Sequence, residues 1–234
     1  MLRRFRPALT PTLVALPSLI LLIALGNWQM SRLEWKRDLI ATIESRLAAP
    51  PMDLPTSGID PEALNYRSVR VSGVFHHDKE IHLIAHTKRG ELGYHVITPL
   101  ERTGGGFVLI NRGWVPTPGR NPMTRIEGQV AGPLDVNGIV RKPWAQRQFV
   151  PDNDPKKNVW FYGDLAGMAA HLGITAVPVF VEADGTENPG GWPQGGQTRV
   201  SFTNNHLQYA LTWYGLAIVL LVVYLVYHRK EQRL

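Results

Sequence analysis

The sequence predicts a membrane protein with one transmembrane α-helix near each end and one β-rich domain, mainly antiparallel, between them. No charged side chain occurs from residue 7 to residue 31, and residues 200–227 contain only His206 among the histidine and charged residue types. Each run reaches the roughly 20 residues that a helix needs to cross the hydrocarbon core of a bilayer. The residues between the runs form short, partly alternating segments bounded by Gly, Asn, Asp and Pro, a pattern typical of antiparallel sheets.

The order of segments and the location of charge predict a topology. We expect a cytoplasmic N-terminus (1–9), a first span (10–31), an extracytoplasmic domain (32–203) with a Pro-rich linker (48–65), a second span (204–227) and a cytoplasmic C-terminus (228–234). The net charge of +6 is concentrated at the two ends, where Arg3, Arg4, Arg6, Arg229, Lys230 and Arg233 lie. Basic residues flanking membrane helices indicate cytoplasmic ends in contact with a lipid bilayer, and they argue against nucleic acid as a partner.

The N-terminal run is predicted to be a retained anchor, because no small-x-small cleavage pattern follows it. The few residues before position 10 leave no room for an organelle transit peptide, which favours a bacterial cell (inner) membrane. The chain contains no cysteine. This excludes attachment of c-type haem through C-x-x-C-H, a thiolate copper carrier and a thiol-disulfide oxidoreductase.

The central domain is predicted to be a sheet with little helix. Strands are expected at 68–75, 79–86, 93–100, 106–115 and 174–183, with 128–134 and 137–143 continuing the series. One helix is expected within 163–173, with Gly173 as its stop signal. Residues 185–198 are a glycine-rich loop before the second span.

Local motifs give no sign of an enzyme. Sequences such as G-x-S-x-G, H-E-x-x-H and G-x-x-x-x-G-K-[ST] are absent, so we expect no catalytic activity. Four histidines lie close together in the chain, and a metal site among them is geometrically conceivable. We favour exposed strand and turn histidines, because no pair of ligands has a diagnostic spacing; the four are His76, His77, His82 and His86.

Two helix faces carry the candidate site. Trp28, Arg32 and Trp35 recur at helical spacing where the first apolar run ends, and His206, Tyr209 and Trp213 recur where the second begins. Both faces emerge on the same side of the membrane if each helix crosses once. A histidine at such a depth indicates function, although interfacial anchoring explains the same residue types. The combination suits an amphipathic macrocycle, an acidic phospholipid or a partner helix equally well.

At these residues the sequence resembles the Surfeit-locus family of cytochrome c oxidase assembly factors. The matching segments occur in the family's order and cover nearly the whole chain; they are LGNWQMSRLEWK (25–36), VRVSGVFHHDKE (69–80), NRGWVP (111–116) and NNHLQYALTWYG (204–215). In NRGWVP we expect a structural role for Trp114, since its neighbours suit a sharply turning strand end.

The resemblance implies a non-enzymatic chaperone for assembly of the haem-copper cytochrome c oxidase, a respiratory-chain enzyme. It implies transient binding of haem a, its insertion into the catalytic subunit, and the haem a synthesis machinery and that subunit as partners. His206 is then the expected ligand to haem iron, with Arg32 on a propionate and Trp28, Trp35, Tyr209 and Trp213 along the ring. The alternative is a haem-free membrane scaffold that stabilises an unfinished oxidase subunit.

Overall fold

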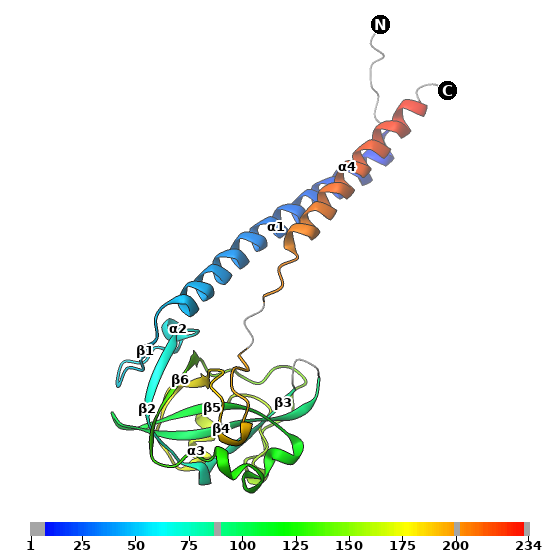
Figure 1. Cartoon of the computed structure of the whole chain (residues 1–234). Helices are drawn as coiled ribbons and strands as arrows, with labels where there is room; N and C mark the ends of the chain where they lie inside the picture. The colour runs from blue at the N-terminus through cyan, green and yellow to red at the C-terminus, as the bar shows by residue number, and fades with distance from the viewer. Residues whose placement is uncertain (1–7, 87–89, 199–201, 232–234) are drawn as a thin grey trace. The chain divides into compact units, whose positions relative to one another are not determined.

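The computed structural model describes residues 8–86, 90–198 and 202–231, which form two compact units (Figure 1). The first unit runs to Thr42 and resumes at Ser201, and the second comprises residues 43–200. Most of the basic residues on which the topology prediction depends, Arg3, Arg4, Arg6 and Arg233, lie outside the described residues.

The first unit contains two long apolar helices, as predicted, and only the last residues of the first helix, 43–48, belong to the second unit. Helix α1 spans Leu9–Ala48 and helix α4 spans His206–Glu231. Each contains a segment that is long and apolar enough to cross a membrane, with a mean hydropathy of 2.1. Helix α1 continues well past residue 31, where its membrane span was predicted to end. Basic residues occupy the last turn of α4, at His228, Arg229 and Lys230.

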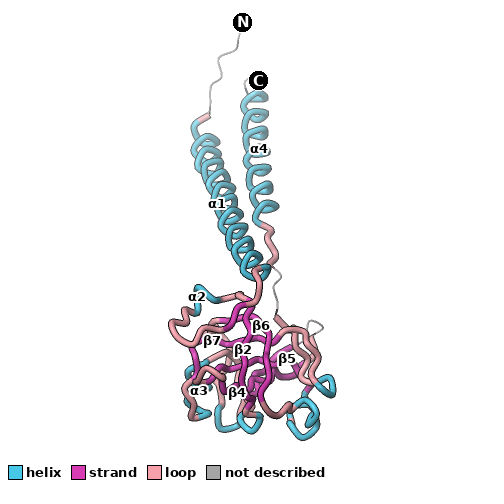
Figure 2. Tube along the Cα trace, turned by 60° about the vertical axis from the view of Figure 1, so that its left-hand side comes forward, coloured by secondary structure: helices cyan, strands magenta, loops and turns pink. Residues whose placement is uncertain are grey.

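Polar side chains join α1 to α4 along their length, and Figure 2 shows the two helices side by side. The Thr12 and Tyr224 hydroxyls lie 2.6 Å apart, and the Tyr214 hydroxyl donates to Asn27 Oδ1 over 2.7 Å. A Cβ added at Gly26 would lie 2.4 Å from the Tyr214 ring. A glycine here lets the aromatic ring approach the α1 backbone, as small residues do between membrane helices.

The second unit is built on a mixed sheet of seven strands among the described residues, in the order β1-β2-β6-β7-β5-β4-β3. An additional pairing between β2 and β4 closes the five strands β2, β6, β7, β5 and β4 into a barrel. Closure removes exposed edges, while β1 and β3 attach outside the ring. The bounds are β1 Met52–Asp53, β2 Ser68–Phe75, β3 Ile81–His86, β4 Leu92–Arg102, β5 Phe107–Pro116, β6 Pro133–Arg141 and β7 Ala176–Ala183.

Apolar side chains fill the two faces of this sheet separately. One buried cluster includes Val69, Leu100, Ile110 and Val181. A second includes Trp160, Met168 and Phe180 together with Ile81, Leu83, Ile97, Leu109 and Leu165. Helix α3, Leu165–Leu172, supplies Met168 and Leu165 to the second cluster. The predicted stop at Gly173 is confirmed, because this residue caps the helix with a left-handed φ of 64°.

Most predicted strands are confirmed, with three differences. The segment 79–86 forms a strand only from Ile81, because His77–Lys79 make a 3₁₀ turn, η1. The predicted pieces 128–134 and 137–143 give one strand, β6, since residues 122–128 form a 3₁₀ segment, η3 (Pro122–Gly128). The sheet is mainly antiparallel as expected, but β1–β2 and β5–β7 pair in parallel.

The remaining short elements lie in loops. The predicted linker 48–65 contains β1 and one helical turn, α2 (Pro61–Leu64), which Asp60 caps through the amides of Glu62 and Ala63. The other 3₁₀ turns are η2 (Thr117–Arg120), η4 (Pro155–Lys157) and η5 (Pro189–Gly191).

Candidate functional site

His206 is the first residue of α4, so its side chain is presented where the helix begins. Asn204 Oδ1 accepts the backbone N–H of His206 over 3.4 Å, and Asn205 O accepts that of Tyr209 over 3.2 Å. The Asn204 side chain therefore satisfies one of the amide donors that a helix start leaves without a partner, and the Asn205 carbonyl begins the regular helical hydrogen bonds. The sequence Asn-Asn-His fixes the position of the imidazole along the helix.

Gln29 of α1 holds the orientation of the His206 ring. Its Oε1 lies 2.7 Å from His206 Nδ1, and Gln29 is only 9% exposed. A side-chain amide oxygen can only accept, so the imidazole donates from Nδ1. In the neutral ring the lone pair then resides on Nε2. Among the described residues, Nε2 has no hydrogen-bond partner, which leaves it available to a ligand.

His228, at the opposite end of α4, provides a contrast within the same helix. Its Nδ1 lies 2.8 Å from Tyr224 O, and its Nε2 accepts the Ala8 amide over 3.0 Å. Both ring nitrogens are engaged, and the residue is 1% exposed. His228 is therefore part of the packing between the two helices.

Arg32 is stacked between two indoles, as the spacing of this face predicted. Its Cζ lies 5.9 Å from the ring centroid of Trp28 and 5.3 Å from that of Trp35. The two indoles are 52% and 55% exposed. Stacking on aromatic rings leaves the edge of a guanidinium free to pair with a carboxylate.

Burial distinguishes the packed faces of α1 and α4 from their exposed faces. Leu33 of α1 is buried, as is Ala210 of α4, so these two lie on the packed faces. Trp28 is one residue from Gln29, which places it about 100° around the helix, on a neighbouring and exposed face. On α4, Tyr209 is 55% exposed and Trp213 is half-buried. The structure thus brings His206 to Gln29 and places the indole–guanidinium stack on the adjacent outer face of α1.

These residues are chemically suited to haem. A neutral imidazole with a free Nε2 is a common axial ligand to haem iron. The cation and the exposed aromatic rings match propionates and a flat macrocycle.

The four histidines that lie close together in the sequence make separate contacts in the central domain. His76 bonds Glu101 Oε2 at 2.9 Å, and His77 bonds the Val130 carbonyl at 2.9 Å. His82 is buried beside the Tyr94 ring, and burial lowers its pKa to about 4. His86 is exposed at the end of β3. Within residues 8–86, 90–198 and 202–231 no group of three His, Cys, Asp or Glu side chains is placed to hold a metal ion. The expectation of exposed histidines holds for His86 but is wrong for His82, which packs in the interior of the domain.

The NRGWVP segment has a structural role, as expected. Trp114 is buried, and its backbone pairs with Gln194. Gly113 has a φ of 126°, and a Cβ there would lie 1.9 Å from Gln194 O. Only glycine fits this approach of the 185–198 loop to β5.

Arg112, in the same segment, belongs to a buried ionic cluster that the sequence did not reveal. Arg125 donates two hydrogen bonds to the Glu80 carboxylate, one from Nη2 to Oε2 and one from Nη1 to Oε1. The Nη1–Oε1 distance is 3.1 Å. Arg112 Nη1 lies 3.5 Å from Glu80 Oε1. Burial opposes ionisation of Glu80, but hydrogen bonds from His77 and Arg125 and the charges of both arginines lower its pKa to about 2. Burial, partly offset by Glu80, lowers the pKa of Arg112 to about 10.

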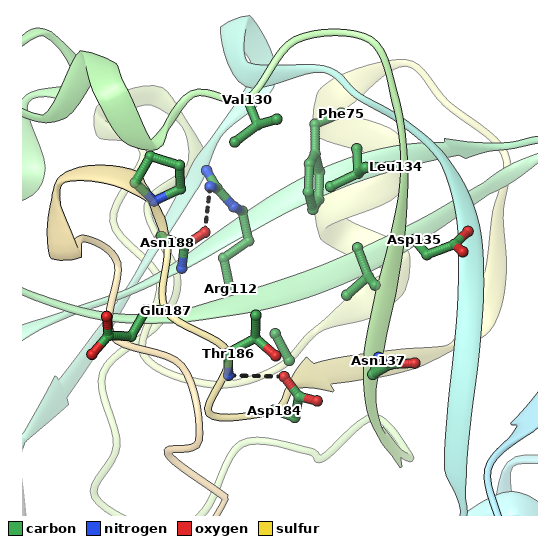
Figure 3. A pocket seen from close by; sticks show the side chains of 13 residues that line it. Phe75, Arg112, Val130, Leu134, Asp135, Asn137, Asp184, Thr186, Glu187 and Asn188 are labelled. Carbon is green, nitrogen blue, oxygen red and sulfur yellow. Dashed lines mark hydrogen bonds between the residues drawn. The ribbon is translucent and has the colours of Figure 1, made fainter.

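The guanidinium of Arg112 also lines a cavity of about 190 Å³ (Figure 3). Its Nη2 donates to Asn188 Oδ1 over 3.0 Å and to the Gly128 carbonyl, and its Cζ lies 4.9 Å from the Phe75 ring centroid. These bonds use the guanidinium to tie the loop after β7 to η3. The cluster is a structural feature of the domain.

Comparisons with known proteins show the family of the chain. The model of the SURF1 family matches residues 16–218, a range that includes Trp28, Arg32 and His206. The chain belongs to the SURF1 family. It is 44% identical over 207 residues to Surfeit locus protein 1 of Mus musculus, covering 82% of this chain and 67% of the mouse protein.

Other relatives agree with this membership. Surfeit locus protein 1 of Homo sapiens is 42% identical over 209 residues, covering 82% of this chain and 69% of the human protein. A SURF1-like protein of Caenorhabditis elegans is 35% identical over 229 residues, covering 88% of this chain and 70% of the nematode protein. Membership in the SURF1 family confirms the resemblance that the four sequence segments indicated.

Proposed function

We propose that this SURF1-family chain is an assembly factor for haem-copper cytochrome c oxidase. It binds haem a transiently and assists its insertion into the catalytic subunit, without catalysing a reaction. Its partners in this proposal are the catalytic subunit, the haem a synthesis machinery and the lipid bilayer. The observation that carries the proposal is the contact between Gln29 and His206, which orients one imidazole with Nε2 free.

Each residue of the candidate site has a defined role in this proposal. His206 Nε2 is the ligand to the haem iron, and Gln29 fixes its tautomer. Arg32 pairs with a propionate, and the rings that contact the macrocycle are those of Trp28, Trp35, Tyr209 and Trp213. The half-exposed indoles support reversible binding, because a carrier must release its cargo.

The proposed location is a bacterial inner membrane, with both termini in the cytoplasm and the central domain outside it. The proposed spans remain 10–31, which lies within α1, and 204–227, which lies in α4 except for its first two residues. His228, Arg229 and Lys230 in the last turn of α4 support a cytoplasmic C-terminus. The three relatives described above are animal proteins, so the bacterial location rests on the sequence alone, and fractionation of the source cells tests it.

Complementation tests the function. In cells where this chain is the only such factor, we would express wild type, His206→Ala or His228→Ala and measure the haem a content and activity of the isolated oxidase. The proposal expects both to fall strongly for His206→Ala and to be retained for His228→Ala, with equal levels of each variant in the membrane. Normal oxidase haem with His206→Ala would contradict the haem role. The haem-free scaffold would then be favoured if the variant still co-purified with the catalytic subunit.

A further inference from the structure

The central domain contains a second cavity, on the outer face of the barrel, that no proposal above uses. Its volume is about 540 Å³, within the range of roughly 300–1,000 Å³ typical of small-molecule sites. Two arginines, three aromatic residues and one carboxylate line it: Arg141, Arg147, Trp144, Phe161, Tyr162 and Glu182. We call it the Arg141 pocket.

Arg141, the last residue of β6, has a guanidinium with unused donors. Its Nε is buried and has no hydrogen-bond partner among the described residues. Its side chain also forms no ion pair within that part of the chain. Its guanidinium packs on the Tyr66 ring, whose centroid lies 4.4 Å from Cζ. A partly buried guanidinium with unsatisfied N–H groups is a strong binding site for an oxyanion.

The single carboxylate in the wall does not neutralise this group. Glu182 on β7 accepts a hydrogen bond from the Thr198 hydroxyl over 2.6 Å, and it forms no ion pair with Arg141. Arg147 adds a second, exposed cation to the same cavity. With two arginines against one carboxylate, the pocket carries a net positive charge.

Contacts with neighbouring residues position the aromatic wall. The Trp144 ring packs on Phe180, with centroids 5.5 Å apart, and a Cβ at Gly163 would lie 2.7 Å from the ring. Asn153 Oδ1 accepts the amides of Phe161 and Tyr162 over 2.8 and 3.4 Å. Rings fixed in this way offer a flat apolar surface at little cost in conformational entropy.

We propose that the Arg141 pocket binds a small organic anion that joins an aromatic or other flat apolar body to a phosphate or carboxylate. The Arg141 fork holds the anionic group, with Arg147 beside it. Trp144 and Tyr162 contact the apolar body. This binding is independent of haem and lies entirely within the second unit.

Calorimetric titration of the full chain in detergent tests the proposal, with phenyl phosphate as the probe. Benzyl alcohol reports the apolar contribution alone, and inorganic phosphate reports the anionic contribution alone. We expect phenyl phosphate to bind more tightly than either. Arg141→Gln should weaken its binding at least tenfold, and Arg141→Lys should restore part of the loss. The control Arg70→Gln, at an exposed position on β2 outside the pocket, should bind like wild type.

Arg147→Gln provides a second variant if Arg141→Gln fails to fold, because the exposed Arg147 side chain is not needed for folding. It should weaken phenyl phosphate binding several-fold and leave benzyl alcohol binding unchanged. The proposal is overturned if phenyl phosphate does not bind at millimolar concentration. It is also overturned if wild type and the arginine variants bind phenyl phosphate with equal affinity. Equal affinity of wild type for phenyl phosphate and benzyl alcohol overturns it as well. The arginine substitutions should leave the haem spectrum unchanged. A failure of this proposal is therefore distinguishable from a failure of the proposed haem function of His206.

Discussion

Gln29 Oε1 lies 2.7 Å from His206 Nδ1, a hydrogen bond that joins residues 177 positions apart in the chain. This bond selects the Nδ1–H tautomer and directs the lone pair of Nε2 away from the Gln29 contact. Partners of this kind orient metal-binding histidines and raise their basicity. The bond gives the imidazole at the start of α4 a fixed orientation and tautomer.

We predict that Gln29→Leu weakens haem a binding by roughly 10- to 100-fold, the range seen when such a supporting partner is removed. The Leu side chain keeps the bulk but leaves the imidazole free to rotate. Gln29→Glu should retain binding, because a carboxylate oxygen also accepts from Nδ1, and should shift the absorption maximum. Haem titration of the purified variants measures both effects. Equal affinity of wild type and Gln29→Leu would show that the bond does not orient an iron ligand.

The spacing between α1 and α4 should matter as much as the bond itself. A side chain at Gly26 collides with the Tyr214 ring, so Gly26→Ile should separate the helices near Gln29 and His206 and reduce haem binding. Gly215→Ala is the matched control, because nothing lies within 4 Å of a Cβ there. Circular dichroism would first confirm that both variants keep the helix content of wild type. Haem titration would then compare their affinities. A Gly26→Ile protein that binds haem like wild type would contradict the need for close packing.

The charge of Arg32 is predicted to act through its exposed edge. Arg32→Leu should weaken haem binding by several-fold, and Arg32→Lys should recover only part of it, because an ammonium lacks the guanidinium fork. Arg37→Leu, which removes an exposed cation from the same helix, should have little effect. Affinities at low and high salt would show whether the lost interaction is electrostatic. Equal losses for the Arg32 and Arg37 variants would indicate general attraction to positive charge.

The buried Glu80 should make the stability of the domain sensitive to acid. Its pKa is lowered from 4.5 to about 2, so the folded state binds fewer protons than the unfolded state in this window. The stabilisation is fully present above pH 4.5 and is lost as the pH falls toward 2. This difference in pKa corresponds to roughly 3 kcal/mol of stability.

Glu80→Gln should therefore destabilise the domain at neutral pH by about 3 kcal/mol, because Arg125 and Arg112 stay buried without their carboxylate. It should also flatten the loss of stability between pH 4.5 and 2. Denaturant unfolding of the full chain in detergent, followed by tryptophan fluorescence, measures both. Glu101→Gln is the control, since the exposed Glu101 side chain pairs with His76 alone among the described residues. An unchanged acid profile in Glu80→Gln would contradict this assignment.

The sequence predicted those parts of the structure that local patterns determine. Charge-free runs predicted both long helices. Alternation of apolar and polar residues predicted β2, and Gly173 predicted the end of α3. The i, i+3 and i+4 spacing correctly placed Arg32 between Trp28 and Trp35. Each of these depends on residues close together in the chain.

Contacts between distant residues were not predictable in the same way. Gln29 and Glu80 have no local signature, because their partners lie 177 and 45 positions away. Closure of the barrel depends on β2 pairing with both β4 and β6, which no single strand pattern specifies. The Arg141 pocket likewise combines β3, β4, β6, β7 and two loops. A search for side chains with unsatisfied hydrogen-bonding groups finds such sites only once the fold is known.

The most direct test of the account is the absorption spectrum of the full chain purified from cells that make haem a. Wild type, His206→Ala and His228→Ala would be compared at equal protein concentration. The account predicts a haem a spectrum in wild type and His228→Ala, and a weakened or shifted spectrum in His206→Ala. The same haem spectrum in all three proteins, or haem in none of them, would contradict His206 as the iron ligand.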